Sequence, residues 1–563
     1  MRQVFLALLL FPVVIFAQQK QDYPTYRSPL NIPIYLSGTF AELRSNHFHS
    51  GIDIRTQGME GQPVFAVGDG YVSRVAVSPG GFGKAIYVNH PEGFTSVYAH
   101  LQRFSPEIEA WVKQQQYAQK NYTVNLYIAK DLFVLKKGQQ LGLSGNSGSS
   151  AGPHLHFEIR DGATQEPLNP LHFGYVMKDY IRPAISTFAA YPLSDSAQVN
   201  GSENAFYSAV EGWGEQHRLP NHQPIYGIGE LAFGISVIDQ HNDTPNKNGV
   251  YSVELKSDNQ TIFKYAADRF SFTETRYINS FIDYAYFVET KKRLIRSQRD
   301  PLNKLRIYEK DSGIITLREG DTVQAEFVVM DFNKNISCLP FLVIGRKADK
   351  PTSKQAAEGV LVKAGTAFEL RKSDFYVEIN PECFYRDEKL TINQKVDSNY
   401  FSSIYTIGDQ TIPVHKSFDL GIRIPKNVNS SKLYMVQLDR KGKAAAQDSK
   451  ISGDFVTAKP RVLGEFTLLL DTLKPEISAV NFKKGKLSDG IKTLKVKIKD
   501  EQSGIDSYEA TLNGSWLLMA YDAKNDLLIY EFDERLKKGE NQFTLQVTDK
   551  VGNTALLRMQ LIH

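Results

Sequence analysis

Three short stretches carry the residues that decide the fold at the amino-terminal end: His49-Ser-Gly-Ile-Asp53, Tyr98-Ala-His-Leu101 and Gly152-Pro-His-Leu-His-Phe-Glu158. If these stretches are β-strands, side chains two or four residues apart lie on the same face. This alternation pairs His49 with Asp53, and His154 with His156. A catalytic zinc ion takes three ligands from imidazole nitrogen and carboxylate oxygen and keeps a fourth position for water. With His100, these side chains can supply a zinc site and leave two groups for proton transfer.

At these residues the sequence resembles the lysostaphin-like (LytM-type) zinc metallopeptidases of bacterial cell walls. The resemblance covers roughly Leu36 to Pro170. Its motifs are His49-x-x-x-Asp53, Tyr98-Ala-His-Leu101, Lys137-Gly-Gln-Gln-Leu-Gly142, Gly145-Asn-Ser-Gly148 and Gly152-Pro-His-Leu-His-Phe-Glu158. Each motif alone is weak, but their order and spacing together are specific.

The resemblance implies that His49, Asp53 and His156 bind Zn²⁺, while His100 and His154 lie beside the metal and the scissile carbonyl. All five residues are present, so no motif indicates an inactive copy. We expect His154 to be the general base, because it shares a strand with His156. An exchange of roles with His100 stays open.

A further histidine, His47, lies two residues before His49, so on an extended strand both side chains would point to the same face. It could compete for the metal. Only His49 has the His-x-Gly-x-Asp context, so we assign His47 a supporting or structural role.

The resemblance also implies an activity, which is endopeptidase cleavage of the peptide cross-links of peptidoglycan. Which bond is cut depends on loops that the motifs do not specify. One alternative is a non-catalytic protein of the envelope that binds cell wall or activates another hydrolase. A second is an adhesin or scaffold that leaves the zinc residues unused. The zinc content, measured together with the release of soluble fragments from sacculi, separates all three.

The start of the chain has the pattern of a secretory signal. An apolar run from Val4 to Phe16 ends at Ala17, after which we place the cleavage site. The run is shorter than the about 20 apolar residues that a membrane-spanning helix needs. We therefore expect an exported protein, periplasmic or extracellular, with no membrane span.

Composition limits the partners that the chain can bind. There are 66 basic and 62 acidic residues, a near balance that argues against nucleic acid as a partner. The two cysteines, Cys338 and Cys383, fall in segments assigned to different domains. They could form a disulfide in an oxidising compartment or stay as buried thiols.

With 563 residues the chain is too long for one core. Short alternating strands and glycine turns predict a mainly β protein: an antiparallel β metallopeptidase domain followed by immunoglobulin-like β-sandwich domains. We place a signal peptide at 1–17, the peptidase domain at 18–178, a β-sandwich at 179–348, a β-rich domain at 349–470 and an immunoglobulin-like sandwich at 471–563. The later domains are candidates for binding envelope proteins, or are rigid spacers, and we expect them to fold independently of the metal site.

Two features lie outside the motifs. A helix is expected over 107–120 and strand-like chain over 122–135, within an insertion near 104–135 that could cover a sheet edge or form a substrate lid. An internal repeat pairs Ile235–Asp239 with Val496–Asp500, Gly249–Glu254 with Gly504–Glu509, and Val329–Asn335 with Val547–Asn553.

Overall fold

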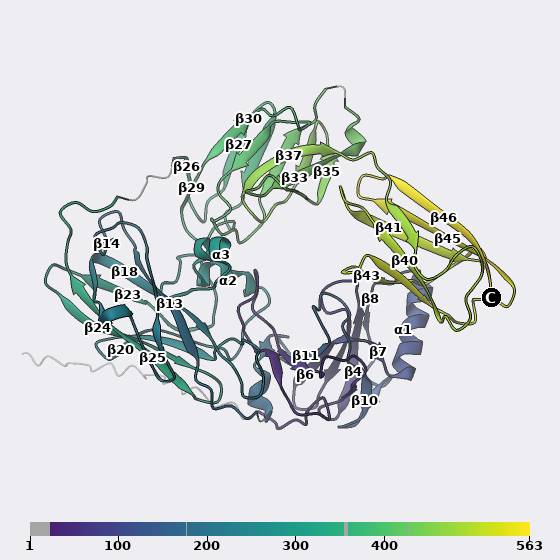
Figure 1. Ribbon diagram of the computed structural model, residues 1–563, viewed down its shortest axis with the longest axis horizontal. Coiled ribbons are helices and arrows are strands. Elements are labelled where there is room, and N and C mark those ends of the chain that lie inside the picture. Colours follow the sequence, from purple (N-terminus) through teal and green to yellow (C-terminus); the bar gives the residue numbers. More distant parts are fainter. Residues whose placement is uncertain (1–22, 176, 354–357, 427) are drawn as a thin grey trace, which may run out of the picture.

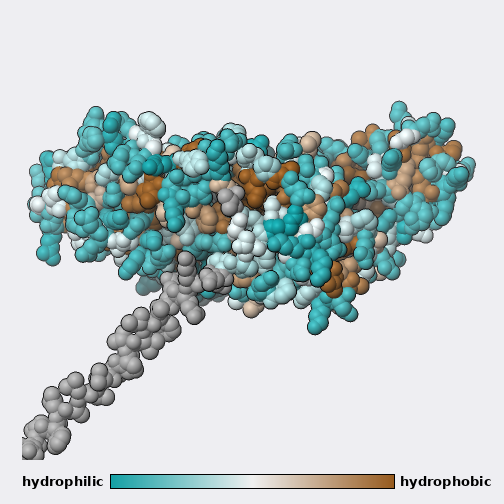
Figure 2. All heavy atoms as spheres, turned by 90° about the horizontal axis from the view of Figure 1, so that it is seen from below, coloured by the Kyte–Doolittle hydropathy of each residue, from teal (hydrophilic) through white to brown (hydrophobic). Residues whose placement is uncertain are grey.

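The computed structural model describes residues 23–175, 177–353, 358–426 and 428–563. The protein is mainly β, as predicted, and its apolar residues gather in four large cores that follow the chain. Figure 1 shows four domains around a ring, with the last domain beside the first. Seen from below in Figure 2, the molecule is a flat body covered largely by hydrophilic residues.

Two further expectations concern the membrane and the thiols. The predicted signal peptide lies outside the described residues. Within the described ranges, no helix is long and apolar enough to cross a membrane. Cys338 and Cys383 are both free thiols.

The amino-terminal domain, residues 23–175, contains the three stretches quoted above. A nine-stranded sheet has the order β1-β2-β11-β6-β5-β4-β8, and its two remaining strands pair with inner strands, β9 with β4 and β12 with β11. A three-stranded sheet has the order β3-β10-β7. Its elements are β1 (Leu36–Gly38), β2 (Ile52–Arg55), β3 (Pro63–Phe65), β4 (Gly70–Val77), β5 (Lys84–Asn89), β6 (Phe94–Leu101), β7 (Arg103–Phe104), α1 (Pro106–Gln119), β8 (Val124–Tyr127), β9 (Val134–Leu135), β10 (Gln140–Leu143), β11 (His154–Asp161), β12 (Pro167–Leu168) and η1 (Pro170–Phe173).

The strands that carry the site lie in the middle of the large sheet. Every residue of β6 is buried, and β11 pairs with β2 on one side and β6 on the other. Helix α1 matches the helix expected at 107–120. It has a proline in its first turn and is capped by Lys120. The left-handed backbone of Lys120 lets its N–H donate to the carbonyls of Gln116 and Tyr117.

The second domain, residues 177–353, is built on one 13-stranded sheet system. Its elements are β13 (Ala184–Pro192), β14 (Gln198–Val199), β15 (Phe206–Ala209), β16 (Glu211–Trp213), β17 (Gln216–Arg218), η2 (Pro220–His222), β18 (Ile225–Ile238), β19 (Ser252–Ser257), β20 (Gln260–Ala266), η3 (Thr275–Tyr277), α2 (Ile278–Phe281), α3 (Tyr284–Thr290), β21 (Ile295–Arg296), β22 (Tyr308–Asp311), β23 (Ile314–Leu317), β24 (Thr322–Met330) and β25 (Ile336–Gly345).

The third domain lies within residues 358–470 and the last domain covers 471–563. The third has two five-stranded sheets and a two-stranded one, and the last pairs a four-stranded with a five-stranded sheet. The third contains β26 (Val360–Val362), β27 (Phe368–Arg371), β28 (Phe375–Ile379), β29 (Glu388–Leu390), β30 (Ile392–Lys395), β31 (Ile404–Ile407), β32 (Asp419–Arg423), η4 (Ser430–Lys432), β33 (Leu433–Leu438), β34 (Ala444–Ala446), β35 (Ser449–Ser452), β36 (Phe455–Ala458) and β37 (Gly464–Leu470). The last contains β38 (Glu476–Ala479), β39 (Gly485–Lys486), β40 (Thr493–Lys499), β41 (Ile505–Leu512), β42 (Ser515–Trp516), β43 (Ala520–Asp522), β44 (Leu527–Glu531), β45 (Glu540–Asp549) and β46 (Thr554–Ile562).

The first two domains share a hydrophobic core. Phe40 and Phe48 belong by sequence to the amino-terminal domain, but they are buried in the core of the second domain. The ring of Phe48 lies 5.6 Å from that of Phe270 and 5.8 Å from that of Phe281. Because His49 follows Phe48 directly, the core of the second domain positions a predicted zinc ligand. This packing argues against independent folding of the second domain.

We therefore predict that Phe48→Ala weakens both the fold and the zinc site. Phe48 is 2% exposed, and truncation of a buried Phe costs about 3–5 kcal/mol of unfolding free energy. Denaturant unfolding, followed with zinc titration, measures both effects. Phe401→Ala is the control, since Phe401 is 41% exposed in the third domain. Equal loss in both variants would contradict the shared core.

Candidate metal centre

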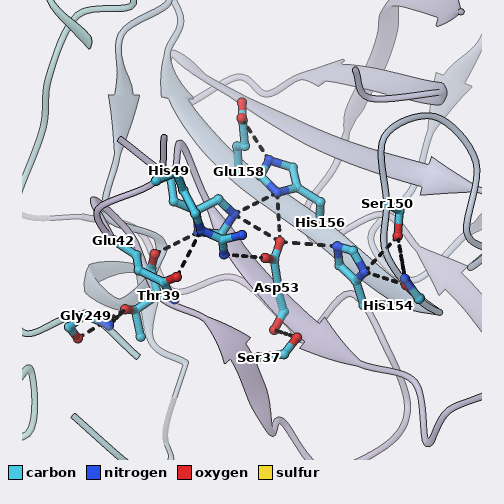
Figure 3. A network of polar contacts seen from close by, with 12 residues as sticks. Ser37, Thr39, Glu42, His49, Asp53, Ser150, His154, His156, Glu158 and Gly249 are labelled. Carbon is cyan, nitrogen blue, oxygen red and sulfur yellow. Dashed lines mark hydrogen bonds and ion pairs between the residues drawn. The ribbon is translucent and has the colours of Figure 1, made fainter. Parts of the chain in front are cut away.

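Three of the predicted residues converge on one point. The Nε2 atom of His49 lies 3.0 Å from Oδ1 of Asp53 and 3.1 Å from Nδ1 of His156. The third side of this triangle, from His156 Nδ1 to Asp53 Oδ1, is 2.9 Å. All three residues are buried. Figure 3 shows the three side chains pointing at one another.

The spacing and the chemistry of these atoms fit a zinc ion. Two ligand atoms of a tetrahedral zinc, each bound at about 2.0–2.1 Å, lie about 3.3 Å apart. The observed triangle is slightly smaller than that. Two imidazole nitrogens and one carboxylate oxygen form a donor set that zinc accepts and that leaves a fourth position open.

Hydrogen bonds fix the orientation of each imidazole in the triangle. His49 donates from Nδ1 to the carbonyl of Thr39 at 2.7 Å, so its Nε2 keeps a lone pair for the metal. His156 donates from Nε2 to Oε1 of Glu158 at 3.0 Å, so its Nδ1 faces the same point. Both residues therefore present a metal-binding nitrogen without rotation of the ring.

The other two predicted histidines are oriented in the same way. His100 donates from Nδ1 to the carbonyl of Ser147 at 2.9 Å, and His154 donates from Nδ1 to that of Gly152 at 2.9 Å. Their rings are 4.9 Å apart, and Nε2 of His154 lies 3.4 Å from Oδ1 of Asp53. Each keeps an Nε2 lone pair that can accept a proton near the triangle.

The strand alternation explains only part of this arrangement. Asp53 lies on β2, and His154 and His156 lie on β11, as predicted. His49 precedes β2 in a loop, so the expectation that it shares a strand with Asp53 is wrong. His47 lies in the same loop, exposed, with Nδ1 bonded to the carbonyl of Ser45, and is outside the triangle.

Two backbone features position the site. His100 lies near the carboxyl end of β6. Its φ of 58° is a left-handed conformation that is uncommon for residues other than glycine. Its N–H donates to the carbonyl of Phe82, which lies opposite in the turn after β4. Gly38, on β1, lies so close to Asp53 that an added Cβ would stand 2.6 Å from Oδ2.

Charge is concentrated at the centre. Burial would raise the pKa of Asp53, but the neighbouring imidazoles of His49, His154 and His156 hold it well below its usual range. Burial would lower the pKa of His156, but hydrogen bonds with Asp53 and Glu158 raise it to about 9. The pKa of His100 falls to about 3, through burial first and then its neighbouring histidines.

Sequence reasoning assigned no role to three residues that support the site. Glu158 is fully buried, accepts a hydrogen bond from Ser50 and pairs with Arg160, and despite burial its pKa is about 2. Arg44 donates to Oδ2 of Asp53 at 3.1 Å, and the ring of Phe82 lies 5.0 Å from that of His156. The sequence could have identified Glu158 as a supporting residue, because it follows His156 by two positions in the His-Leu-His-Phe-Glu motif and therefore lies on the same face of the strand.

The last domain reaches the loop between β10 and β11. Lys524 donates through Nζ to the carbonyls of Asn146 and, at 3.1 Å, of Ser150. Helix α1 forms the rest of this contact: Lys113 pairs with Asp533 at 2.6 Å, and the ring of Tyr117 lies 5.4 Å from that of Trp516. The predicted insertion thus supports the last domain.

Two segments match known families. Residues 47–124 match Peptidase family M23, and residues 360–471 match the Zu5-like domain. The first match confirms the predicted peptidase resemblance of the amino-terminal region. It contains His49, Asp53 and His100 and ends before β11.

Several relatives match part of the chain. An uncharacterized metalloprotease of Haemophilus influenzae is 34% identical over 21% of this chain and 20% of its own length. The DD-carboxypeptidase/endopeptidase Mpg of Neisseria meningitidis is 30% identical over 26% of this chain and 28% of its own. The peptidoglycan DD-endopeptidase ShyB of Vibrio cholerae is 31% identical over 20% of each chain. The chain therefore spans less than a third of the length of these relatives.

We predict that zinc binding at pH 7 releases a proton. With a pKa of about 9, His156 is protonated at pH 7 in the metal-free site, and its Nδ1 must lose that proton to bind zinc. Zinc affinity should therefore rise as the pH is raised from 7 towards 9. Calorimetry in two buffers of different ionisation enthalpy counts the protons. Zinc binding without proton release at pH 7 would contradict this electrostatic description.

Proposed function

We propose that this chain is a zinc-dependent endopeptidase that hydrolyses the peptide cross-links of peptidoglycan. One observation carries the proposal. Four histidines each have one ring nitrogen held by a carbonyl or carboxylate. The other nitrogens of His49, His154 and His156 lie 3.0, 3.4 and 2.9 Å from Oδ1 of Asp53, and the ring of His100 lies 4.9 Å from that of His154. A merely structural polar cluster would not need the same orientation four times.

In this proposal His49, Asp53 and His156 hold zinc. A bound zinc ion polarises a carbonyl and lowers the pKa of a coordinated water from 15.7 to about 7. Glu158 orients His156, and the carbonyl of Thr39 orients His49. Arg44 neutralises part of the charge of Asp53 through Oδ2, whereas His49 and His156 face Oδ1.

His154 takes the proton of the attacking water at Nε2 and later gives it to the leaving amine. Its side chain is partly exposed, as a group that meets substrate must be. His100 accepts a hydrogen bond at Nε2, because its Nδ1–H is held by Ser147 and its low pKa keeps it neutral. This favours a role in orienting the water over the donation of a proton to an oxyanion.

Location and partners follow from the same proposal. Peptidoglycan lies outside the cytoplasmic membrane, so the enzyme acts in the periplasm or outside the cell, in agreement with the signal pattern at residues 1–17. The non-catalytic adaptor is the second candidate. It would bind cell wall with the same fold and release no fragments.

Variants of His154 and His100 test the mechanism. His154→Ala and His100→Ala should keep about one zinc and lose about 100-fold to 10,000-fold of the rate of fragment release from sacculi. Asp53→Ala should lose the metal as well. The control is His47→Ala, because His47 is exposed and outside the triangle. Wild-type rates in both variants would remove His154 and His100 from the mechanism, whereas no release by the wild type would favour the adaptor.

We also propose that the last domain forms one wall of the substrate groove. A cavity of about 460 Å³ lies between the domains, and it is lined by Lys84 and Asn146 on one side and by Tyr521 on the other. Lys524 holds the 146–150 loop, in which Ser147 orients His100, and the nearby Gly152 orients His154. Docking of this domain therefore steadies His100 and His154.

Lys524→Met should accordingly lower activity on sacculi and on a small soluble peptide alike, because the substitution removes the ammonium that holds the loop and keeps the apolar stem. Lys538→Met, at an exposed lysine of the same domain, is the control. Loss on sacculi alone would indicate a targeting role instead. A rise in activity would indicate that the last domain obstructs the site.

A further inference from the structure

A second group of metal-ligating side chains lies where the second domain begins. Asp179 comes from the segment before β13, Asp239 follows β18 directly, and His241 lies in the next loop. One ligand atom from each of these residues lies within 4.8 Å of the others. Asp331, which follows β24, interacts electrostatically with all three. The four residues are 5%, 2%, 7% and 2% exposed, respectively.

The charges of this group are not balanced. Three carboxylates are buried, and within the described ranges no lysine or arginine forms an ion pair with them. The Nε2 atom of His241 lies 3.4 Å from Asp239 Oδ2 and 4.0 Å from Asp179 Oδ2. Buried carboxylates this close together need a positive charge, which a bound cation or a protonated His241 can supply.

Two buried oxygen atoms in the group lack partners. Neither Oδ1 of Asp239 nor Oδ1 of Asn248 has a hydrogen-bond partner among the described residues. Asn248 contacts His241, with 3.3 Å between its Nδ2 and the imidazole Nδ1. Buried polar atoms are nearly always paired, so an unpaired oxygen on a carboxylate whose other oxygen lies 3.4 Å from an imidazole nitrogen indicates a ligand.

The internal repeat supplies a comparison within the same chain. Asp471, Asp500 and Asp549 form the matching group in the last domain. Asp179 and Asp471 each accept a backbone N–H from two residues ahead, both at 3.1 Å. In the second domain, the side chain of Asn335 donates to the carboxylate of Asp331 and to the carbonyl of Asp179. In the last domain, the side chain of Asn553 donates in the same way to the carboxylate of Asp549 and to the carbonyl of Asp471.

The two groups differ in how the first aspartate is satisfied. Oδ2 of Asp471 accepts two hydrogen bonds from Ser503, at 3.1 Å from its N–H and 2.6 Å from its hydroxyl. In the second domain, Oδ2 of Asp179 instead lies 4.0 Å from Nε2 of His241. Gln502 stands at the position of His241, two residues after the second aspartate. The second domain thus replaces protein donors with a metal-ligating side chain.

We propose that Asp179, Asp239 and His241 bind a divalent transition-metal cation, with Asp331 adding negative charge. Carboxylates alone would suit Ca²⁺ or Mg²⁺, but the imidazole shifts the preference to ions such as Mn²⁺ or Zn²⁺. The site is separate from the triangle of His49, Asp53 and His156. It does not depend on the proposed peptidase activity.

The cation would fix a loop that supports the first metal centre. Backbone bonds between Asp239 and Asn248, at 2.8 and 2.9 Å, close this loop. Gly249, next in the chain, exchanges two hydrogen bonds with the hydroxyl of Thr39, at 3.0 and 3.1 Å. The carbonyl of Thr39 holds His49, and Figure 3 shows this path from Gly249 to His49. Metal binding in the second domain thereby stabilises the orientation of His49.

Mn²⁺ binding to the full-length chain tests the proposal. Asp53→Ala serves as the background, so that the first centre contributes least. In this background, Asp239→Asn and His241→Gln should each lose about one equivalent of bound Mn²⁺ by elemental analysis after equilibrium dialysis. Asp243→Asn, at an exposed aspartate of the same loop, should lose none. His241→Gln copies the residue of the last domain and guards against a variant that fails to fold.

Thermal unfolding separates a metal site from an ion pair of protonated His241. If a cation is the native partner of these carboxylates, the Asp239→Asn substitution relieves the repulsion between them when the cation is removed. In EDTA, the variant should then unfold at the same or a higher temperature than its Asp53→Ala parent. The parent should then gain stability from Mn²⁺, and Asp239→Asn should not. Equal Mn²⁺ binding by Asp239→Asn and Asp243→Asn, or a lower unfolding temperature of Asp239→Asn in EDTA, would overturn the proposal.

Discussion

The buried carboxylate of Asp53 is the constraint on which the amino-terminal domain depends. A charge at this depth is costly unless cationic or donor groups surround it. Here three imidazoles and a guanidinium face it, and each imidazole is held from behind by a carbonyl or carboxylate. A preorganised set of this kind favours a metal cation in the middle, because each ring already presents an unprotonated nitrogen once the excess proton leaves.

The site also depends on parts of the chain far from its motifs. Phe48 anchors the residue before His49 in the core of the second domain, and Gly249 of that domain holds Thr39 behind the same histidine. On the opposite side, Lys524 of the last domain holds the loop that orients His100 and His154. Figure 1 shows the second domain on one side and the last domain on the other side of the amino-terminal domain, which holds the candidate metal centre.

Local patterns predicted much of the fold and the site. Alternation along β11 placed His154 and His156 correctly, and the proline and acidic first turn of α1 agree with the expected helix. Alternation failed for His49, because its position comes from the packing of Phe48 rather than from a strand. The contacts of Lys524 join residues almost four hundred positions apart, and no local periodicity encodes such a contact.

The most direct test of the central claim is X-ray absorption at the zinc edge, on full-length protein loaded with one equivalent of zinc. A centre formed by His49, Asp53 and His156 predicts two imidazole nitrogens and a carboxylate oxygen at about 2.0–2.2 Å, with one further oxygen from solvent. The Asp53→Ala variant should lose this first shell. A shell of water oxygens alone, or a spectrum unchanged by Asp53→Ala, would contradict the account.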